Sequence, residues 1–349
     1  MKFLGVFLLA LAGLAASYLA VVRVVDARAE LSDPLKSRLF PTVVINSRTE
    51  KMRLFQARRQ AGGITGLVLG SSRAMKLNPA DLDRATGLRF FNFAVDSACA
   101  EDYLAIYRWA VSRGARPKLL LLGLDIEALH DNDAFDERLE QNGLLLAALG
   151  ADGPAPPKGW QSLVRKLGRW KATLTLDYWR DTRRAVKARL RPPAIEKMFS
   201  RLEADGYLRY PKWEWERANG RFDVNERIQA SCPEYLERFG DMKSLSPRRQ
   251  ALLKKLVSEA RAGGAEVRIW ITTLHPVVVE RLEERTRYRD LLEATRRCLK
   301  ELAGRYGIAV FDLSTPEPFG GSLVGWYDGA HLDEGNVALL TQRLTKGLP

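Results

Sequence analysis

The sequence predicts a three-layer α/β/α sandwich around a mostly parallel sheet. Apolar runs at 63–70, 89–95 and 117–125 are short and continuous rather than alternating, which is typical of strands covered on both faces. Helical patterns lie between these runs. The same alternation returns near the carboxyl end, with strands expected at 265–274 and 308–313. Strands that alternate with helices favour parallel pairing through helical crossovers.

The predicted helices carry recognisable end signals. Asn78 and Pro79 supply an N-cap and a proline in the first turn. Ser246 and Pro247 open a second helix, which two adjacent glycines close. The expected helices cover residues 78–85, 101–114, 246–264, 280–307 (as one long helix or two) and 333–348.

The amino terminus is long and apolar enough for a membrane helix. The uncharged run from Phe3 to Val22 would span about 30 Å as a helix, the thickness of a bilayer core. A cleaved signal peptide is the alternative, because Ala15, Ala16 and Ala20 are the small residues that a cleavage site requires. We predict that residues 1–25 are a transmembrane anchor or an uncleaved signal. The main domain then lies outside the cytoplasm, in a periplasmic or extracellular position at the cell membrane.

The rest of the chain divides by composition. Residues 26–62 are a mixed polar segment, expected to be a juxtamembrane stalk. The α/β pattern occupies 63–130 and 246–349, and residues 131–245 interrupt it with a basic, tryptophan-rich and mainly helical insertion. Such an insertion packs over the carboxyl edge of the sheet, where open α/β folds bind ligands, or serves as a module for a membrane surface or a partner.

Charge and cysteine content limit the classes of partner. The formal net charge of +13 favours anionic partners such as phospholipid headgroups, acidic polysaccharide or nucleic acid. An extracytoplasmic domain argues against nucleic acid. Cys99, Cys232 and Cys298 are far apart and form no CxxC pair, so the sequence indicates no zinc site and no disulfide framework. We expect no cofactor and no metal.

Two segments carry residues that are suited to nucleophilic catalysis. Ser72 follows the first strand, where main-chain N–H groups stabilise negative charge, although serines are also common strand-end caps. Asp328 and His331 lie three residues apart just before the last helix. A serine needs a base to accept its proton, and the base needs an acceptor that fixes its tautomer. The alternative is a loop histidine beside a helix cap.

Together these residues resemble the SGNH (GDSL-like) hydrolase superfamily in four blocks that occur in the correct order. Gly70-Ser71-Ser72 resembles the first block, with Ser72 as nucleophile and Ser71 in place of the usual aspartate. FNFAVDSA resembles the second, with Ser97 where a glycine normally donates a main-chain N–H to the oxyanion. LLGLD resembles the third, and DGAH the fourth. The resemblance implies an SGNH- or flavodoxin-like sheet with Asp328 as the orienting acid and His331 as the base.

The third block departs from the family pattern. Asp125 stands where the family has an asparagine that donates to the oxyanion. An ionised carboxylate would repel that charge, so Asp125 can donate only if protonated, and otherwise binds a substrate hydroxyl or stabilises a loop. Arg73 beside the nucleophile and His275 after a strand are further candidates for oxyanion or substrate binding. His275 is equally well explained as an ordinary turn residue. His130 and the aspartates that follow it are expected to form a solvated acidic loop.

The Gly-Ser-Ser-Arg and Gly-Leu-Asp variants, the anchor and the basic domain resemble a membrane-anchored branch of this superfamily. Its members act in polysaccharide O-acetylation, as for alginate, and in D-alanyl transfer. The resemblance implies a serine-dependent O-acyl, in particular acetyl, esterase or acyltransferase. Its expected partners are a cell-surface polysaccharide and a membrane-bound O-acyltransferase. Two alternatives stay open: an inactive SGNH fold that binds glycan or scaffolds an acylation complex, and a peripheral protein that associates with membranes through its insertion.

Overall fold

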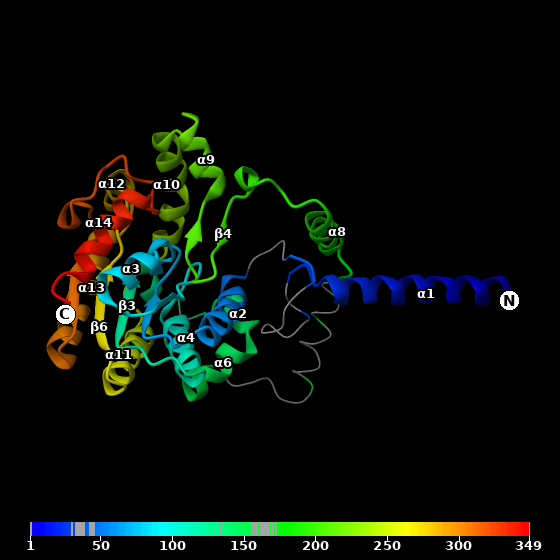
Figure 1. Ribbon diagram of the computed structural model, residues 1–349, viewed down its shortest axis with the longest axis horizontal. Helices are drawn as coiled ribbons and strands as arrows, with labels where there is room; N and C mark the ends of the chain where they lie inside the picture. Colours follow the sequence, from blue (N-terminus) through cyan, green and yellow to red (C-terminus); the bar gives the residue numbers. More distant parts are fainter. Residues whose placement is uncertain are drawn as a thin grey trace. The chain divides into compact units, whose positions relative to one another are not determined.

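A five-stranded parallel sheet forms the centre of the protein, which is described from a computed structural model. The strand order is β2-β1-β3-β6-β7, and every neighbouring pair is parallel. Leu67 lies opposite both Phe91 and Leu120. Figure 1 labels β3 and β6 of this sheet. The predicted α/β fold is therefore confirmed. The strands are β1 (Gly66–Leu69), β2 (Phe90–Asn92), β3 (Leu119–Leu124), β6 (Glu266–Ile271) and β7 (Ala309–Asp312).

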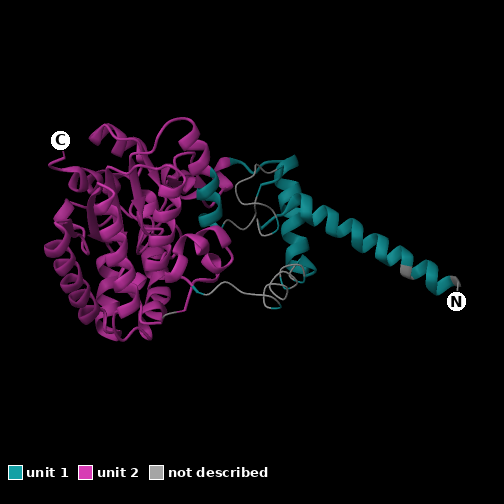
Figure 2. Ribbon diagram, turned by 90° about the horizontal axis from the view of Figure 1, so that it is seen from below, with its two compact units in different colours: residues 1–53, 154–194 teal, residues 54–153, 195–349 magenta. Residues whose placement is uncertain are grey.

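The structure describes most of the chain, in two compact units. It leaves out residues 1, 29–30, 32–38, 42–45, 133, 155–159, 161–167, 169–170, 172 and 349. The predicted stalk at 26–62 therefore lies partly outside the described residues. One unit comprises Met1–Arg53 and Pro154–Ala194, and the other comprises Leu54–Gly153 and Ile195–Pro349, which includes the sheet (Figure 2).

Helices cover both faces of the sheet. On one face α3 (Pro79–Thr86) packs against α14 (Glu334–Thr345), and their apolar side chains share a core with Val68, Leu121 and Trp270 of the strands. On the other face α11 (Pro247–Ala262) packs against both α4 (Ala100–Ser112) and α13 (Tyr288–Tyr306). The pattern at 280–307 is two helices rather than one, because α12 (Pro276–Arg285) ends before α13 begins. The short 3₁₀ helices are η1 (Ala74–Lys76), η2 (Ile126–Leu129), η3 (Gly150–Asp152), η4 (Ile195–Lys197) and η5 (Glu317–Phe319).

The predicted insertion, residues 131–245, divides between the two units. Only its middle part, with α8 (Leu176–Leu190), groups with the amino-terminal segment. The remainder packs in the same unit as the sheet, and it comprises α5 (Glu137–Glu140), α6 (Gly143–Leu149), β4 (Arg201–Leu202), β5 (Leu208–Arg209), α9 (Pro211–Ala218) and α10 (Val224–Gly240).

The turn of the β4–β5 hairpin explains this packing. The main-chain N–H of Asn92, at the end of edge strand β2, donates to the carbonyl of Asp205 over 2.9 Å. Gly206 follows with φ of +86°, and a Cβ there would lie 2.1 Å from the Asn92 carbonyl oxygen. Only glycine allows this approach, so the hairpin docks directly on the edge of the sheet.

The amino-terminal unit contains one membrane-length helix. α1 (Lys2–Val25) is the one described helix that is long and apolar enough to cross a membrane. An amino-terminal helix of this kind is typical of a membrane anchor or of a signal sequence. The second helix, α2 (Ser47–Gln60), crosses the division between the units.

Candidate active site

A tight turn after β1 presents Ser72. Gly70 has φ of +145°, and a Cβ there would lie 2.5 Å from the Ala74 Cβ and 2.9 Å from the Gly123 carbonyl oxygen. The turn and η1 therefore pack against β3 without room for a side chain. Ser71 is buried within the turn, where its Oγ accepts from the Arg73 N–H over 3.2 Å, whereas Ser72 is partly exposed.

Ser72, His331 and Asp328 form a continuous hydrogen-bonded chain. The His331 Nε2 lies 2.9 Å from the Ser72 Oγ. The His331 Nδ1 lies 2.9 and 2.8 Å from the two carboxylate oxygens of Asp328. A proton on Nδ1 satisfies the carboxylate and leaves Nε2 free to accept from the serine hydroxyl. This is the arrangement in which a histidine acts as the base for a serine nucleophile.

The loop itself keeps Asp328 ionised. Asp328 Oδ1 also accepts the main-chain N–H groups of Ala330 and His331 over 2.8 and 2.9 Å. Burial alone would raise the pKa of Asp328, but the attraction of His331 and these hydrogen bonds outweigh it and lower the pKa. The orienting group is therefore a carboxylate at neutral pH.

The structure thus brings together three residues that the sequence analysis placed in one site from separate blocks. No family model and no curated protein matches this chain. The resemblance to SGNH hydrolases stays an expectation from the four sequence blocks.

Residues of the predicted insertion hold the Asp328–His331 loop, and the sequence analysis missed them. Arg217 in α9 lies 2.5 Å from the Asp333 carboxylate, the N-cap of α14, and also donates to the Trp326 carbonyl. Ser231 in α10 accepts the main-chain N–H of Gly329 over 3.1 Å. The insertion therefore supports the loop on both sides of Asp328.

A buried lysine joins the hairpin to the same loop. Lys76 is fully buried, 2.9 Å from the Glu334 carboxylate, and its ammonium lies 4.8 to 5.2 Å from three tyrosine ring centroids. Burial lowers the pKa of Lys76 more than the attraction of Glu334 raises it. The rings belong to Tyr207, Tyr210 and Tyr327, and the ring of Tyr210 also packs edge-on against His331 at 5.8 Å. No sequence pattern pairs these residues, because their contacts cross more than 100 positions.

Ser72 and Ser97 carry the main-chain N–H groups that the sequence analysis expects to bind an oxyanion. Ser97 has φ of +47°, a left-handed conformation that favours glycine and is uncommon for serine. Within the described part of the chain, neither the N–H of Ser72 nor that of Ser97 donates to another residue. Within those residues, both groups are therefore main-chain donors without a partner.

Asp125 is occupied by neighbouring side chains. The Thr272 hydroxyl donates to its Oδ1 over 2.6 Å, and the Arg73 Nη1 lies 3.5 Å from the same oxygen. Arg73 also pairs with Glu127 at 2.5 Å and lies over the Tyr235 ring. Burial alone would lower the pKa of Arg73, but the attraction of Asp125 and Glu127 raises it well above its ordinary value. Of the three roles open to Asp125, these contacts favour loop stabilisation, and they also occupy Arg73.

The imidazole of His275 is held by hydrogen bonds at both ring nitrogens. Its Nδ1 accepts the Val277 N–H and caps α12, while Nε2 lies 3.2 Å from the Leu323 carbonyl oxygen. Its main-chain N–H donates to the Gly329 carbonyl, and burial lowers its pKa. His275 therefore braces the loop that carries Asp328 and has both ring nitrogens occupied.

The other polar groups considered in the sequence analysis form no comparable centre. Within the described residues, no group of three or more His, Cys, Asp or Glu side chains is placed to hold a metal ion, and Asp133 lies outside them. The three cysteines are free thiols, and burial raises the pKa of Cys99 to about 12 and that of Cys298 to about 11.

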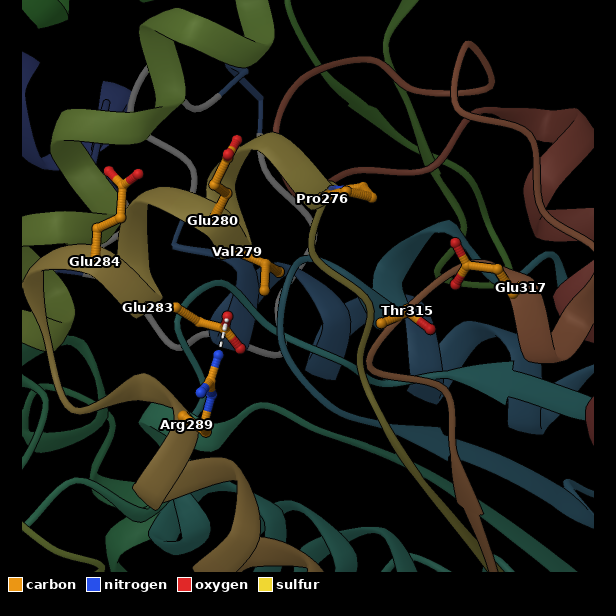
Figure 3. Close-up of a pocket in the computed structure, with 8 residues that line it drawn as sticks. All are labelled: Pro276, Val279, Glu280, Glu283, Glu284, Arg289, Thr315 and Glu317. Carbon is orange, nitrogen blue, oxygen red and sulfur yellow. Dashed lines mark hydrogen bonds and ion pairs between the residues drawn. The ribbon is translucent and has the colours of Figure 1, made fainter.

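A separate depression of about 440 Å³ lies beside α12 (Figure 3). Its wall is acidic, with Glu283 pointing to Arg289 while Glu280 and Glu284 point away from that pair (Figure 3). None of Ser72, Asp328 or His331 lines it. We assign the candidate active site to the serine and not to this depression.

Proposed function

We propose that this protein is a membrane-anchored, extracytoplasmic O-acyl esterase or acyltransferase that acts on a cell-surface polysaccharide. The observation that carries the proposal is the hydrogen-bonded chain from Ser72 through His331 to Asp328. Acetyl esters of sugar hydroxyls are the substrates that the sequence resemblance favours.

The geometry supports a two-step acyl transfer. His331 accepts the Ser72 proton as the Oγ attacks the ester carbonyl, which gives a tetrahedral oxyanion. Collapse breaks the bond to the alcohol, which takes the proton from the imidazolium and leaves, while the acyl group stays on Ser72. Water or a sugar hydroxyl then attacks the acyl-enzyme with His331 again as base, which regenerates Ser72.

The oxyanion depends on main-chain donors in this proposal. We assign this role to the N–H groups of Ser72 and Ser97, because neither donates to another described residue. Asp125 accepts a hydrogen bond from Thr272 instead of donating one. The site therefore lacks the side-chain oxyanion donor of the family that the sequence resembles. Losing one such donor commonly costs about 10²–10³ in rate, so we expect a slow enzyme.

The amino terminus supports the proposed location. A retained α1 would hold the main domain at the outer face of the membrane, beside a membrane-bound O-acyltransferase that supplies acyl groups. The net charge of +13 suits an anionic polysaccharide.

Labelling of the serine tests the proposal directly. We expect the full chain in detergent to hydrolyse 4-nitrophenyl acetate and to react with a fluorophosphonate at Ser72. Ser72→Ala should abolish labelling and lower turnover by at least about 10³-fold. Ser71→Ala is the matched control, because Ser71 lies one residue away inside the turn, and it should still be labelled. Turnover that survives Ser72→Ala would contradict the nucleophile assignment.

A second candidate, an inactive SGNH fold that binds glycan, is favoured by one observation. Asp125 places a carboxylate where a donor is expected, and its partners fix it there. A wild-type chain that binds acetylated polysaccharide but takes no fluorophosphonate label would support this candidate over the enzyme.

A further inference from the structure

The helix α8 (Leu176–Leu190) exposes an apolar and basic stripe. Leu176, Trp179, Arg183, Lys187 and Leu190 follow one another at spacings of three or four residues and so lie along one side of the helix. The exposed fractions of Leu176, Trp179 and Leu190 are 74%, 46% and 76%. The Arg183 guanidinium lies over the Trp179 ring at 5.4 Å. A water-soluble surface seldom presents three large apolar side chains in one line.

The opposite side of α8 packs against the carboxyl-terminal end of α1. Its buried residues are Tyr178, Asp181, Thr182 and Ala185. Ala185 shares an apolar cluster with Val25 and Ala27, and Asp181 pairs with Arg28 at 2.8 Å. In both views of the amino-terminal unit, α8 lies across the end of α1 and not along it (Figures 1 and 2).

One hydrogen bond determines where along the axis of α1 the helix α8 begins. The Tyr18 hydroxyl donates to the Thr173 carbonyl over 2.6 Å, just before α8 begins. Tyr18 lies four residues inside the apolar run that ends at Val22, which is about 6 Å along a helix. If α1 spans the bilayer, the start of α8 is therefore at the depth of the headgroup and acyl boundary, where interfacial helices lie.

The chemistry of the stripe fits that depth. Leucine side chains enter the acyl boundary, tryptophan prefers the headgroup level, and lysine and arginine extend their charges toward anionic headgroups. We propose that α8 is an interfacial helix that lies on the membrane beside the exit of α1 and binds anionic phospholipid headgroups through Arg183 and Lys187. This inference rests on the proposed anchoring by α1 and is independent of the chemistry at Ser72.

Site-specific photo-crosslinking tests this surface. The full chain is reconstituted into vesicles of phosphatidylcholine and phosphatidylglycerol at three to one, with p-benzoyl-phenylalanine in place of Trp179. A second chain carries the same group in place of Asp177, which lies in the same turn but away from the stripe and is the matched control. Vesicle flotation first establishes anchoring, and mass spectrometry then identifies the adducts.

We expect phospholipid adducts at position 179 and few at position 177. The ratio of phosphatidylglycerol to phosphatidylcholine adducts should exceed the input ratio by about fivefold, and Arg183→Gln with Lys187→Gln should remove that excess. Adducts to protein instead of lipid at position 179, or equal lipid adducts at both positions, would overturn the interfacial helix alone. A chain that does not float with the vesicles overturns the anchor and the interfacial helix together, while leaving the proposed chemistry at Ser72 unaffected.

Discussion

The histidine side of the candidate site and its oxyanion side are supported by different parts of the molecule. Asp328 and His331 lie on a loop that Arg217 and Ser231 hold from the insertion. Asp125, in contrast, is held by partners at the ends of the sheet strands, Thr272 and Arg73. The insertion therefore holds the proposed base, whereas the polar network at Asp125 joins the ends of the strands. Substitutions at the loop of Asp328 and His331 should therefore act mainly on the rate, and substitutions at Asp125 mainly on the stability.

Asp328→Asn should give the largest effect, a fall in kcat of about 10⁴-fold for the acetyl ester, because an amide favours the wrong tautomer of His331. Steady-state kinetics measures this fall. Asp290→Asn, at an exposed carboxylate paired with Arg287, is the control and should leave kcat unchanged. An Asp328→Asn enzyme with wild-type kcat would remove the histidine side from the mechanism.

The same substitution should change the pH dependence of stability. Because the folded pKa of Asp328 lies below its unfolded value, its pairing stabilises the protein above the unfolded pKa. That contribution is lost as the pH falls through the lowered folded pKa. Wild-type stability, measured by urea unfolding, should therefore decline more steeply below about pH 4 than that of Asp328→Asn.

Arg217→Ala tests whether the insertion positions the loop that carries Asp328 and His331. Removing the guanidinium frees the Trp326 carbonyl and the Asp333 carboxylate, so His331 should lose its alignment with Ser72. We expect kcat to fall by about 10- to 100-fold while KM changes little, since the residue does not contact the reacting atoms. Arg221→Ala is the control, because Arg221 is exposed and stacks on Trp215. A change in KM alone would point to substrate binding by Arg217.

The sequence predicted the sheet, the turn at Ser72 and the partnership of Asp328 with His331 because each depends on local signals. Buried strands appear in the sequence as continuous apolar runs. Asp328 and His331 lie only three residues apart, within one short loop. It did not predict Tyr210, Arg217, Ser231 or Lys76, because their partners lie far away in the chain. Gly206 is an example: a glycine beside an aspartate is typical of a turn, but no neighbouring residue indicates that this turn packs against Asn92. The sequence therefore left two interpretations of the insertion open, packing over the sheet or a separate module, and could not assign Arg217 and Ser231 to the Asp328–His331 loop.

Asp125→Asn tests the oxyanion side. Asparagine is the residue at this position in the family that the sequence resembles. The carboxylate that it replaces accepts a hydrogen bond from the Thr272 hydroxyl and lies 3.5 Å from the Arg73 guanidinium. We expect the rate to change by less than about threefold and the free energy of unfolding to fall by roughly 1–3 kcal/mol. Thr272→Val should cost a similar amount, and the double variant less than the sum of the two. A rate increase of about 10²-fold would show instead that the amide reaches the oxyanion.

Substitutions of Ser97 should have the smallest effects, and they separate a main-chain donor from a side-chain donor. Ser97→Gly removes the backbone strain of φ +47°, which costs the folded state about 1–2 kcal/mol. It also raises the conformational entropy of the unfolded chain, which destabilises the folded state by about 0.4–1 kcal/mol. We therefore expect the free energy of unfolding to rise by roughly 0.5–1 kcal/mol. Ser97→Ala keeps the strained backbone and removes only the hydroxyl. Both variants keep the N–H, so both should retain the wild-type kcat within about threefold if the main chain is the donor. A large fall in kcat in both variants would assign the oxyanion contact to the Ser97 hydroxyl. A fall in kcat in Ser97→Gly alone would mean that the left-handed backbone of Ser97 orients the N–H donor.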